Sequence, residues 1–440
     1  MTIARGLCAV AACALGGLGG LGGLAGCGAP GGAAIELRMW VLGREGELVA
    51  ELVAGFEREH PGIHVEIQQL PFLSAHEKLL TAFVGDATPD LAPIGNTWLS
   101  EFAALGALAP LDAEIAASSV VRPADYFAGI WATNQVDGVP YGVPWYVDTR
   151  LVFYRRDEFA DAGYPALPDT WTGWLAAMRA IKARVGPERF AVLLPLDEWE
   201  QLTALALQSG EPLLRDRERW GNFRSAGARR ALGFYLQLFI DQLAPRVTLI
   251  QVPNPWDELA RGYFACFIHG PWSIGEFKRR LPPDQQALWA TAPLPGPRGP
   301  GASLAGGSSF VVFRRSRHAR QAWQLIEYLS RPEIQRRFYA LSGDLPPRRS
   351  SWDGPELAAE PRVAAFRDQL ERVHGTPAVP EWERIATEIR IASERAARRV
   401  SPATTPGELA AIVDETAAEI DARTDQLLDK RRWILAREAR

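Results

Sequence analysis

The 440-residue sequence predicts an α/β protein of two lobes joined by three crossings of the chain. The chain is longer than one core usually organises, which favours two lobes. Strand and helix patterns alternate from residue 35 onward, as in a lobe built on a mostly parallel sheet. Extended or Pro-rich stretches interrupt this order near 140–150, 292–303 and 344–350. Three passages between two lobes account for this spacing; three ordinary surface loops are the alternative.

The first lobe begins with strands and helices in alternation. Apolar residues spaced three or four apart mark the helices, and apolar runs bounded by Gly and Pro mark the strands. The predicted strands lie at 35–42, 61–70 and 90–94, and the predicted helices at 46–60, near 74–84 and from 96 onward. Asn96 is placed to cap the last of these helices.

The second lobe follows an extended, Pro-punctuated segment at 137–159. Further helices are predicted at 171–183, 198–208, 225–243, 318–330 and 332–342, strands at 263–268 and 308–313, and a mostly helical remainder to 440. With the three crossings, the predicted lobes are 35–147 with 296–344, and 148–295 with 345–440.

The N-terminus has the plan of a secretory signal peptide. Arg5 supplies one positive charge, and an uncharged apolar stretch then runs from Leu7 to Gly26. The final Leu24-Ala-Gly-Cys27 resembles the bacterial lipobox, in which the cysteine thiol receives a lipid. We therefore expect a signal peptide at 1–26, a lipid on Cys27 and a flexible tether at 27–34. An uncleaved membrane anchor and an ordinary signal peptide are the alternatives.

Composition and motifs argue against several classes of function. A formal net charge of -4 does not indicate the basic surface that nucleic-acid binding requires. The sequence shows no H-E-x-x-H motif, Cys/His cluster or Walker motif, so we expect neither a metal nor a cofactor. Residues 17–22 match G-x-G-x-x-G but lie in the signal peptide and follow no strand. Cys266 alone remains after export and lipidation, which predicts a buried thiol without a disulfide.

Five segments resemble, in order, those of extracellular solute-binding proteins of the sugar-binding, maltose-binding-protein-like kind (family 1). They are "MWVLGREGELVAELVAGFEREHPGIHVE", "GDATPDLAPIGNTWLSEFAALGALAPLD", "VPWYVDTRLVFYRRDEFADAGYPALPDTW", "FIHGPWSI" and "GGSSFVVFRRSRHARQAWQLIEYLSRPEIQRRF". The resemblance implies a periplasmic-binding-protein-like fold, in which two α/β lobes close on a ligand held between them. It also implies a monomer that captures a mono- or oligosaccharide outside the cytoplasm. The monomer would deliver the sugar to the permease subunits of an ATP-binding-cassette importer. The lipid on Cys27 would hold the protein at a bacterial membrane, in the periplasm or at the outer face of the cytoplasmic membrane.

Two residues are the main candidates for ligand contact. A sugar site needs polar groups for the hydroxyls and aromatic planes for the ring faces. Trp272 follows Gly270-Pro271 at a strand end, where α/β sheets face their ligand crevice. The family's matching Trp stacks on sugar, and its acidic ligand contact matches Asp148. The alternatives are a Trp packed under the next helix and an Asp148–Arg150 salt bridge.

The other candidates come from strand ends, loops and the crossings. They are Arg44, Glu45, Asn96, Thr97, Trp145, Trp256, Gly306, Gly307, Arg348 and Trp382. Trp145 is equally a hinge-packing residue, and Trp256 is the weakest, with core packing favoured. The glycines either admit ligand to backbone N–H groups or only form a turn. Arg349 is an alternative to its neighbour Arg348.

The favoured function is therefore a binding protein and not an enzyme. An exported glycan hydrolase is the alternative, but that chemistry needs two placed carboxyl groups. The sequence places only Asp148 convincingly in a cleft. A binding protein for a non-sugar solute, such as a glycerophosphodiester or a polyamine, is also open. A phosphate ligand would need basic groups in the cleft, which Arg44 and Arg348 would supply.

Overall fold

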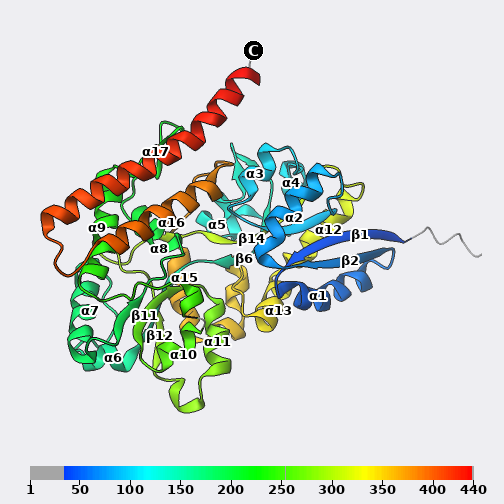
Figure 1. The fold of residues 1–440 in the computed structure, drawn as a ribbon. Coiled ribbons are helices and arrows are strands. Elements are labelled where there is room, and N and C mark those ends of the chain that lie inside the picture. Colours follow the sequence, from blue (N-terminus) through cyan, green and yellow to red (C-terminus); the bar gives the residue numbers. More distant parts are fainter. Residues whose placement is uncertain (1–33, 253, 439–440) are drawn as a thin grey trace, which may run out of the picture.

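The computed structural model describes residues 34–252 and 254–438, which form two α/β lobes (Figure 1). The predicted signal peptide, Cys27 and all but the last residue of the tether lie outside these described residues. Each lobe is built around one larger sheet, and the chain passes from one sheet to the other three times.

The first sheet has the strand order β2-β1-β3-β14-β6. Its strands are β1 (Ile35–Leu42), β2 (Ile63–Leu70), β3 (Leu91–Gly95), β6 (Val143–Asp148) and β14 (Gly306–Val312). Strand β1 is parallel to both β2 and β3, whereas β14 is antiparallel to β3 and β6. Four of the five strands run in one direction and β14 runs against them, so the sheet is mixed, with two parallel and two antiparallel pairs where a mostly parallel sheet was predicted.

Helices cover both faces of this sheet, so alternate side chains of its strands enter different cores. The helices of the segments that build it are α1 (Glu45–Glu59), α2 (Phe72–Val84), α3 (Leu99–Ala104), α4 (Asp112–Ala117), α5 (Ala128–Ala132), α12 (Ala319–Leu329) and α13 (Pro332–Ser342). Leu37 and Met39 pack toward α1 and α12, while Ala92 and Ile94 pack toward α2 and α3. A small hairpin of β4 (Gln135–Val136) and β5 (Val139–Pro140) precedes β6.

The second sheet has the order β12-β7-β11-β8. Its strands are β7 (Leu151–Arg155), β8 (Phe190–Leu193), β11 (Phe264–His269) and β12 (Trp289–Ala292), and a separate pair is formed by β9 (Leu214–Arg215) and β10 (Trp220–Gly221). Its helices are α6 (Arg156–Asp161), α7 (Trp171–Val185), α8 (Glu200–Leu207), α9 (Ala226–Ile240), α10 (Pro255–Ala260), α11 (Trp272–Arg280), α14 (Pro355–Ala358), α15 (Pro361–Leu370), α16 (Trp382–Arg399) and α17 (Pro406–Glu438). The sequence patterns missed β8 and β12, which are only four residues long. Cys266 is buried in β11, as predicted.

The three passages between the sheets lie side by side. The chain leaves β6 after Asp148 and enters β7 at Leu151; it returns between β12 and β14; it leaves again between α13 and the short helical turn η4 (Arg349–Asp353). Val147 N donates to Leu345 O at 2.9 Å, which joins the first passage to the third. Strand β13 (Ser303–Leu304) of the second passage pairs with β15 (Val373–His374).

Two long helices close the fold at its C-terminal end. Helix α17 runs along α16 and α9, and its last turns project beyond the body of the molecule (Figure 1). Within the described ranges, no helix combines the length and apolar character needed to cross a membrane.

Candidate functional site

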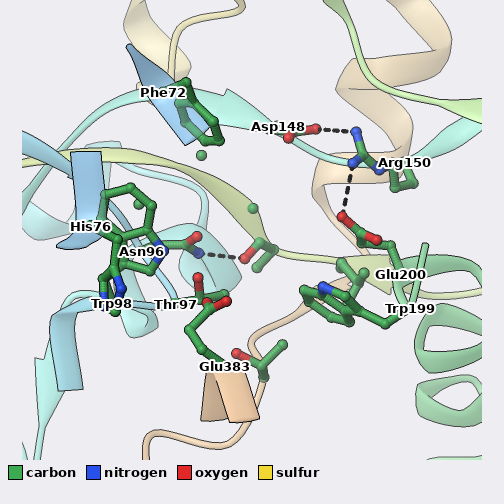
Figure 2. A pocket seen from close by; sticks show the side chains of 16 residues that line it. Phe72, His76, Asn96, Thr97, Trp98, Asp148, Arg150, Trp199, Glu200 and Glu383 are labelled. Atoms are coloured by element: carbon green, nitrogen blue, oxygen red, sulfur yellow. Dashed lines mark hydrogen bonds and ion pairs between the residues drawn. The ribbon is translucent and has the colours of Figure 1, made fainter. Parts of the chain in front are cut away.

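A cavity of about 380 Å³ lies at the junction of the two lobes (Figure 2). It is lined by Phe72, His76, Gly95, Asn96, Thr97, Trp98, Asp148, Arg150, Trp199, Glu200, Leu304, Ala305, Gly306, Gly307, Thr376 and Glu383. These residues come from the first lobe, from the first two passages and from the second lobe, so the site exists only where the lobes meet.

Sheet topology brings these segments to one edge. Strand β3 ends at Gly95 and β6 ends at Asp148, while the reversed strand β14 begins at Gly306. The carboxyl ends of parallel strands and the amino end of an antiparallel neighbour share one edge of a sheet. This is the edge at which α/β proteins place their ligands.

The glycine pair at the start of β14 forms the floor of the cavity. A Cβ on Gly306 would lie 2.1 Å from Asp148 O, and one on Gly307 would lie 2.2 Å from Tyr146 O. Gly307 also has a φ of +139°, which disfavours other residues. Both glycines are thus needed for close pairing with β6, which a simple turn would not require. Asn96 Nδ2 donates to Ala305 O at 2.6 Å, so the side chain crosses this floor.

That bond also corrects one prediction. Helix α3 begins at Leu99, and Trp98 is its N-cap, without a side-chain cap hydrogen bond. Asn96 therefore does not cap the helix, because the helix begins three residues later, and its side-chain amide donates instead to Ala305, just before β14.

Aromatic side chains line the cavity from both lobes. Phe72, at the start of α2, is 53% exposed and its ring lies 5.9 Å from that of buried Trp98. On the opposite side, Trp199 precedes α8 and meets buried Trp382 edge-on at 5.6 Å. Figure 2 shows Phe72 and Trp199 across the centre of the cavity from each other. The site thus offers apolar planes from two directions.

The polar part of the lining is acidic. Arg150 binds Asp148 at 3.0 Å and Glu200 at 3.2 Å, which places one cation between two carboxylates. Burial raises the pKa of Asp148, and Arg150 partly offsets this. Burial also raises the pKa of Glu383, against a hydrogen bond from Thr97 and the nearby His76 ring. The lining therefore presents three carboxyl groups against a fully paired arginine.

Five of the predicted site residues line this cavity together: Asn96, Thr97, Asp148, Gly306 and Gly307. Arg44 and Glu45 lie outside the lining: Arg44 is exposed, and Glu45 is half-buried near Asp344. Trp256 also lies outside, where its Nε1 donates to Ser273 Oγ at 3.1 Å and its ring faces Arg280.

Trp272 is not among the lining residues, although it contacts the lining residue Arg150. Its ring folds back over Gly270, where an added Cβ would lie 2.0 Å from Trp272 Cζ3. The guanidinium of Arg150 covers the ring at 4.9 Å, and His269 meets it edge-on. Trp272 is half-buried and does not belong to the cavity lining, so a ligand contact by this indole stays a prediction.

Two further candidates, Trp145 and Trp382, are placed away from the cavity. Trp145 is the extra residue of a β-bulge in β6, which turns its ring into the first-lobe core, stacked on Phe338 at 4.6 Å. Trp382 is 1% exposed and supports Trp199 from behind. Both rings are thus buried in cores, where a ligand in the cavity does not reach them.

The arginine pair of the third passage also points elsewhere. Arg348 is buried, and its guanidinium binds Asp125 at 2.6 Å. Arg349 pairs with Glu371 on the surface. Neither supplies a basic group to the cavity, because each is neutralised by an acidic partner of its own.

Several lining residues were missed by sequence reasoning. They are Phe72, His76, Trp98, Arg150, Trp199, Glu200, Thr376 and Glu383. Phe72 follows β2 as Asn96 follows β3, so the strand-end rule applied to every strand finds it. Trp199 and Glu200 follow β8, which the patterns did not detect. Thr376 and Glu383 carry no local signal, since they reach the site through the loop after β15 and through the packing of α16.

Comparison with known proteins agrees with this architecture. Residues 42–336 match the family model described as bacterial extracellular solute-binding protein. The sugar-binding protein MalE from the phytopathogen Xanthomonas citri is 52% identical, with a TM-score of 0.86, over 91% of this chain and 99% of that chain. The diacetylchitobiose binding protein DasA of Streptomyces coelicolor is 25% identical over 81% of this chain and 83% of the relative. An uncharacterized lipoprotein of Streptomyces antibioticus is 28% identical over 82% of both.

A two-lobed fold with a cavity at the lobe junction defines a solute-binding protein. The chain belongs to the family of bacterial extracellular solute-binding proteins. It is therefore a binding protein that acts outside the cytoplasm, and not an enzyme.

Proposed function

We propose that this protein binds a carbohydrate between its lobes and delivers it to an ATP-binding-cassette importer. The observation that carries the proposal is the lining itself: carboxylates, an amide and a hydroxyl surrounded by aromatic rings from both lobes. Ionised or amide groups hold sugar hydroxyls, and aromatic planes cover the C–H faces of the ring. The similarity to a sugar-binding MalE over nearly the whole chain supports the same ligand class.

The proposed moving units are 35–147 with 296–344, and 148–295 with 345–440. Asn96, Thr97, Asp148 and the two glycines would bind the ligand, together with Phe72, Trp199, Glu200 and Glu383. A volume of about 380 Å³ is near the small end of ligand sites, which span about 300–1,000 Å³. One or two sugar rings suit it better than a long oligosaccharide.

The charge of the lining argues against an anionic ligand. Arg150 is already shared by two carboxylates, and Arg44 and Arg348 lie outside the cavity. A phosphate would face Asp148, Glu200 and Glu383 without a free cation among the lining residues. A neutral sugar therefore fits better than a glycerophosphodiester.

Calorimetry on the mature protein with a panel of solutes tests the proposal. Maltose, trehalose, glucose and N,N′-diacetylchitobiose represent neutral sugars; glucose 6-phosphate and glycerol 3-phosphate represent anions; spermidine represents polyamines. We expect saturable one-site binding of at least one neutral sugar and no product by chromatography. Tighter binding of a phosphate or of spermidine, or turnover of any sugar, contradicts the proposal.

Asp148→Asn should weaken binding of that sugar about 10- to 100-fold, because a hydrogen bond to a charged group contributes about 1.5–3 kcal/mol. Asp161→Asn is the matched control, since Asp161 is an exposed aspartate paired with Arg184 far from the lining. Equal affinities of the two variants would remove Asp148 from the site.

We also propose that Cys27 carries a lipid and that 27–34 tethers the receptor to the membrane. The Leu24-Ala-Gly-Cys27 motif after an apolar stretch supports this. Expressed in a bacterial host, the full chain should fractionate with membranes and incorporate labelled fatty acid, whereas Cys27→Ala should incorporate none. Recovery of both in the same soluble fraction contradicts the lipid anchor.

A further inference from the structure

Arg150 is a buried cation at the first passage between the lobes. It is 8% exposed and lies between the end of β6 and the start of β7. Its Nη1 donates to Asp148 Oδ1 at 3.0 Å and its Nη2 to Glu200 Oε1 at 3.2 Å (Figure 2). Its Cζ lies 4.9 Å from the ring centroid of Trp272. One side chain thus contacts three groups that surround the site.

The partners of Arg150 come from separate segments. Asp148 ends a strand of the first sheet, Glu200 begins α8 and Trp272 begins α11. The backbone carbonyl of Arg150 also accepts from Ser303 Oγ of the second passage at 2.6 Å. A planar guanidinium can bridge two carboxylates and stack on an indole at once, whereas the compact ammonium of lysine cannot.

The surroundings of Arg150 make its charge important. Burial raises the pKa of Glu198 to about 7, and Arg150 opposes that rise, as it does for Asp148. Burial lowers the pKa of His269, and Arg150 lowers it further, so the ring beside Trp272 is neutral. Without Arg150, Asp148 would be a partly buried carboxylate with no counter-ion, which is strongly unfavourable.

We propose that Arg150 is a positioning residue of the sugar site. It fixes the carboxylates of Asp148 and Glu200 as hydrogen-bond acceptors and holds Trp272 behind them, and it acts on the ligand through these groups. The inference rests on the proposed function, because it assigns Arg150 a role in sugar binding.

The test compares three variants. Arg150→Met removes the charge with little change in side-chain length. Arg150→Lys keeps the charge but lacks the planar guanidinium that can bind two carboxylates at once. Arg155→Met is the matched control: Arg155 is a second buried arginine, at the far end of the β7 strand that follows Arg150, and it pairs with Asp157 away from the lining. Maltose, trehalose and glucose are titrated into each variant between pH 5 and pH 8, and only the folded fraction is counted.

We expect Arg150→Met to lose about 100-fold in affinity, in line with about 3 kcal/mol for breaking a buried ion pair. The pH below which affinity is lost should rise relative to the wild type, since Asp148 loses the cation that opposes the rise of its pKa. Other titratable groups also face Arg150 and Asp148: Glu198, Glu200, His269 and Asp344. The pH dependence is therefore compared as the ratio of variant affinity to wild-type affinity at each pH. Arg150→Lys should lose less affinity, with no shift in the profile.

If Arg150 had a purely structural role, Arg150→Met and Arg155→Met would both lower stability. The sugar affinity of the folded molecules, and the pH dependence of that affinity, would stay unchanged. That result overturns the inference. A crystal structure of ligand-free Arg150→Met gives a second, sugar-independent readout. We expect Asp148, Glu200 and Trp272 to move, and unchanged positions contradict the role. If the wild type binds no sugar of the panel, the proposed function fails, and the crystal structure still decides whether Arg150 positions these groups.

Discussion

At the scale of single residues, neighbours decide which tryptophans can meet a ligand. Trp145 and Trp382 lie near the lobe junction but are buried, with Phe338 and Trp199 among their neighbours. Trp272 is half-buried, and its ring contacts Arg150. Trp199 is the lining indole of the second lobe because its covering partner, Trp382, lies on the side away from the cavity. Residue type alone does not distinguish these cases.

Gly270→Ala should disturb the site by displacing Trp272. The new Cβ would lie 2.0 Å from Trp272 Cζ3, so the ring must move. We expect destabilisation of about 1–3 kcal/mol, as for overpacked cores, and weaker sugar binding. Urea unfolding and calorimetry measure the two effects.

Gly275→Ala is the matched control for that change. Gly275 lies inside α11, and its added Cβ would meet Arg279 Nη1 at an ordinary 3.5 Å. Alanine should stabilise the helix by up to about 1 kcal/mol. Equal effects of the two substitutions would show that the Gly270 contact is unimportant.

Phe72→Ala should reduce sugar affinity with little loss of stability. The ring is 53% exposed and lines the cavity, so folding gains little from it and a bound sugar would cover it. We expect at least a several-fold loss, since aromatic contacts contribute about 0.5–1.5 kcal/mol beyond their buried area. Leu105→Ala, at a 46% exposed apolar position outside the lining, should leave affinity unchanged. A loss confined to Leu105→Ala contradicts the placement.

At the scale of elements, the third passage carries a buried acid. Asp344 lies between α13 and η4, and burial together with Glu45 and Asp148 raises its pKa to about 7. The unfolded chain releases this proton near pH 4. Between these values the folded state binds more protons than the unfolded state, so stability falls as pH rises from about 4 to about 7.

Asp344→Asn should remove this part of the pH dependence. Asparagine stays neutral, so the variant should gain on the order of a few kcal/mol at pH 8 and nothing near pH 4. Urea unfolding across this range measures the difference. Asp353→Asn, at an exposed position in η4, should follow the wild-type profile. If the stability of Asp344→Asn depended on pH as that of the wild type does, the pKa of Asp344 would not be raised by folding.

At the scale of the whole molecule, the cavity lies where the two sheets point their strand ends toward each other. Three adjacent passages connect the lobes, and a hydrogen bond from Val147 to Leu345 joins the first passage to the third. We propose that the lobes rotate about this region. Binding should favour the conformation in which Phe72 and Trp199 both contact the sugar.

X-ray scattering should therefore show a smaller radius of gyration when a neutral sugar saturates the protein. Hinge closure around a ligand is the physical reason. Glucose 6-phosphate, which should not bind, is the control. An unchanged radius at saturation would contradict lobe closure.

Much of the fold was predictable because its signals are local. The helices α1, α7, α12 and α13 follow from apolar spacing within single windows, and β11 from an apolar run. Strands β8 and β12 escaped because four residues carry too little pattern. Of the site, Asn96, Thr97, Asp148, Gly306 and Gly307 were reachable because they lie at strand ends or a passage. Arg348 was misplaced because its partner Asp125 is distant in sequence.

The sequence by itself determined the α/β class and the three stretches that interrupt the order of strands and helices. It also determined the strands whose ends meet at the cavity. These features depend on periodicity and punctuation, which short windows of sequence contain. Only the tertiary structure decided which side chains face the cavity. The bulge at Trp145, the clearance at Gly270 and the ion pair between Arg150 and Glu200, 50 residues apart, arise from packing between distant segments. Close packing leaves each side chain only the space that its neighbours do not fill, so the orientation of a side chain is a property of the assembled fold.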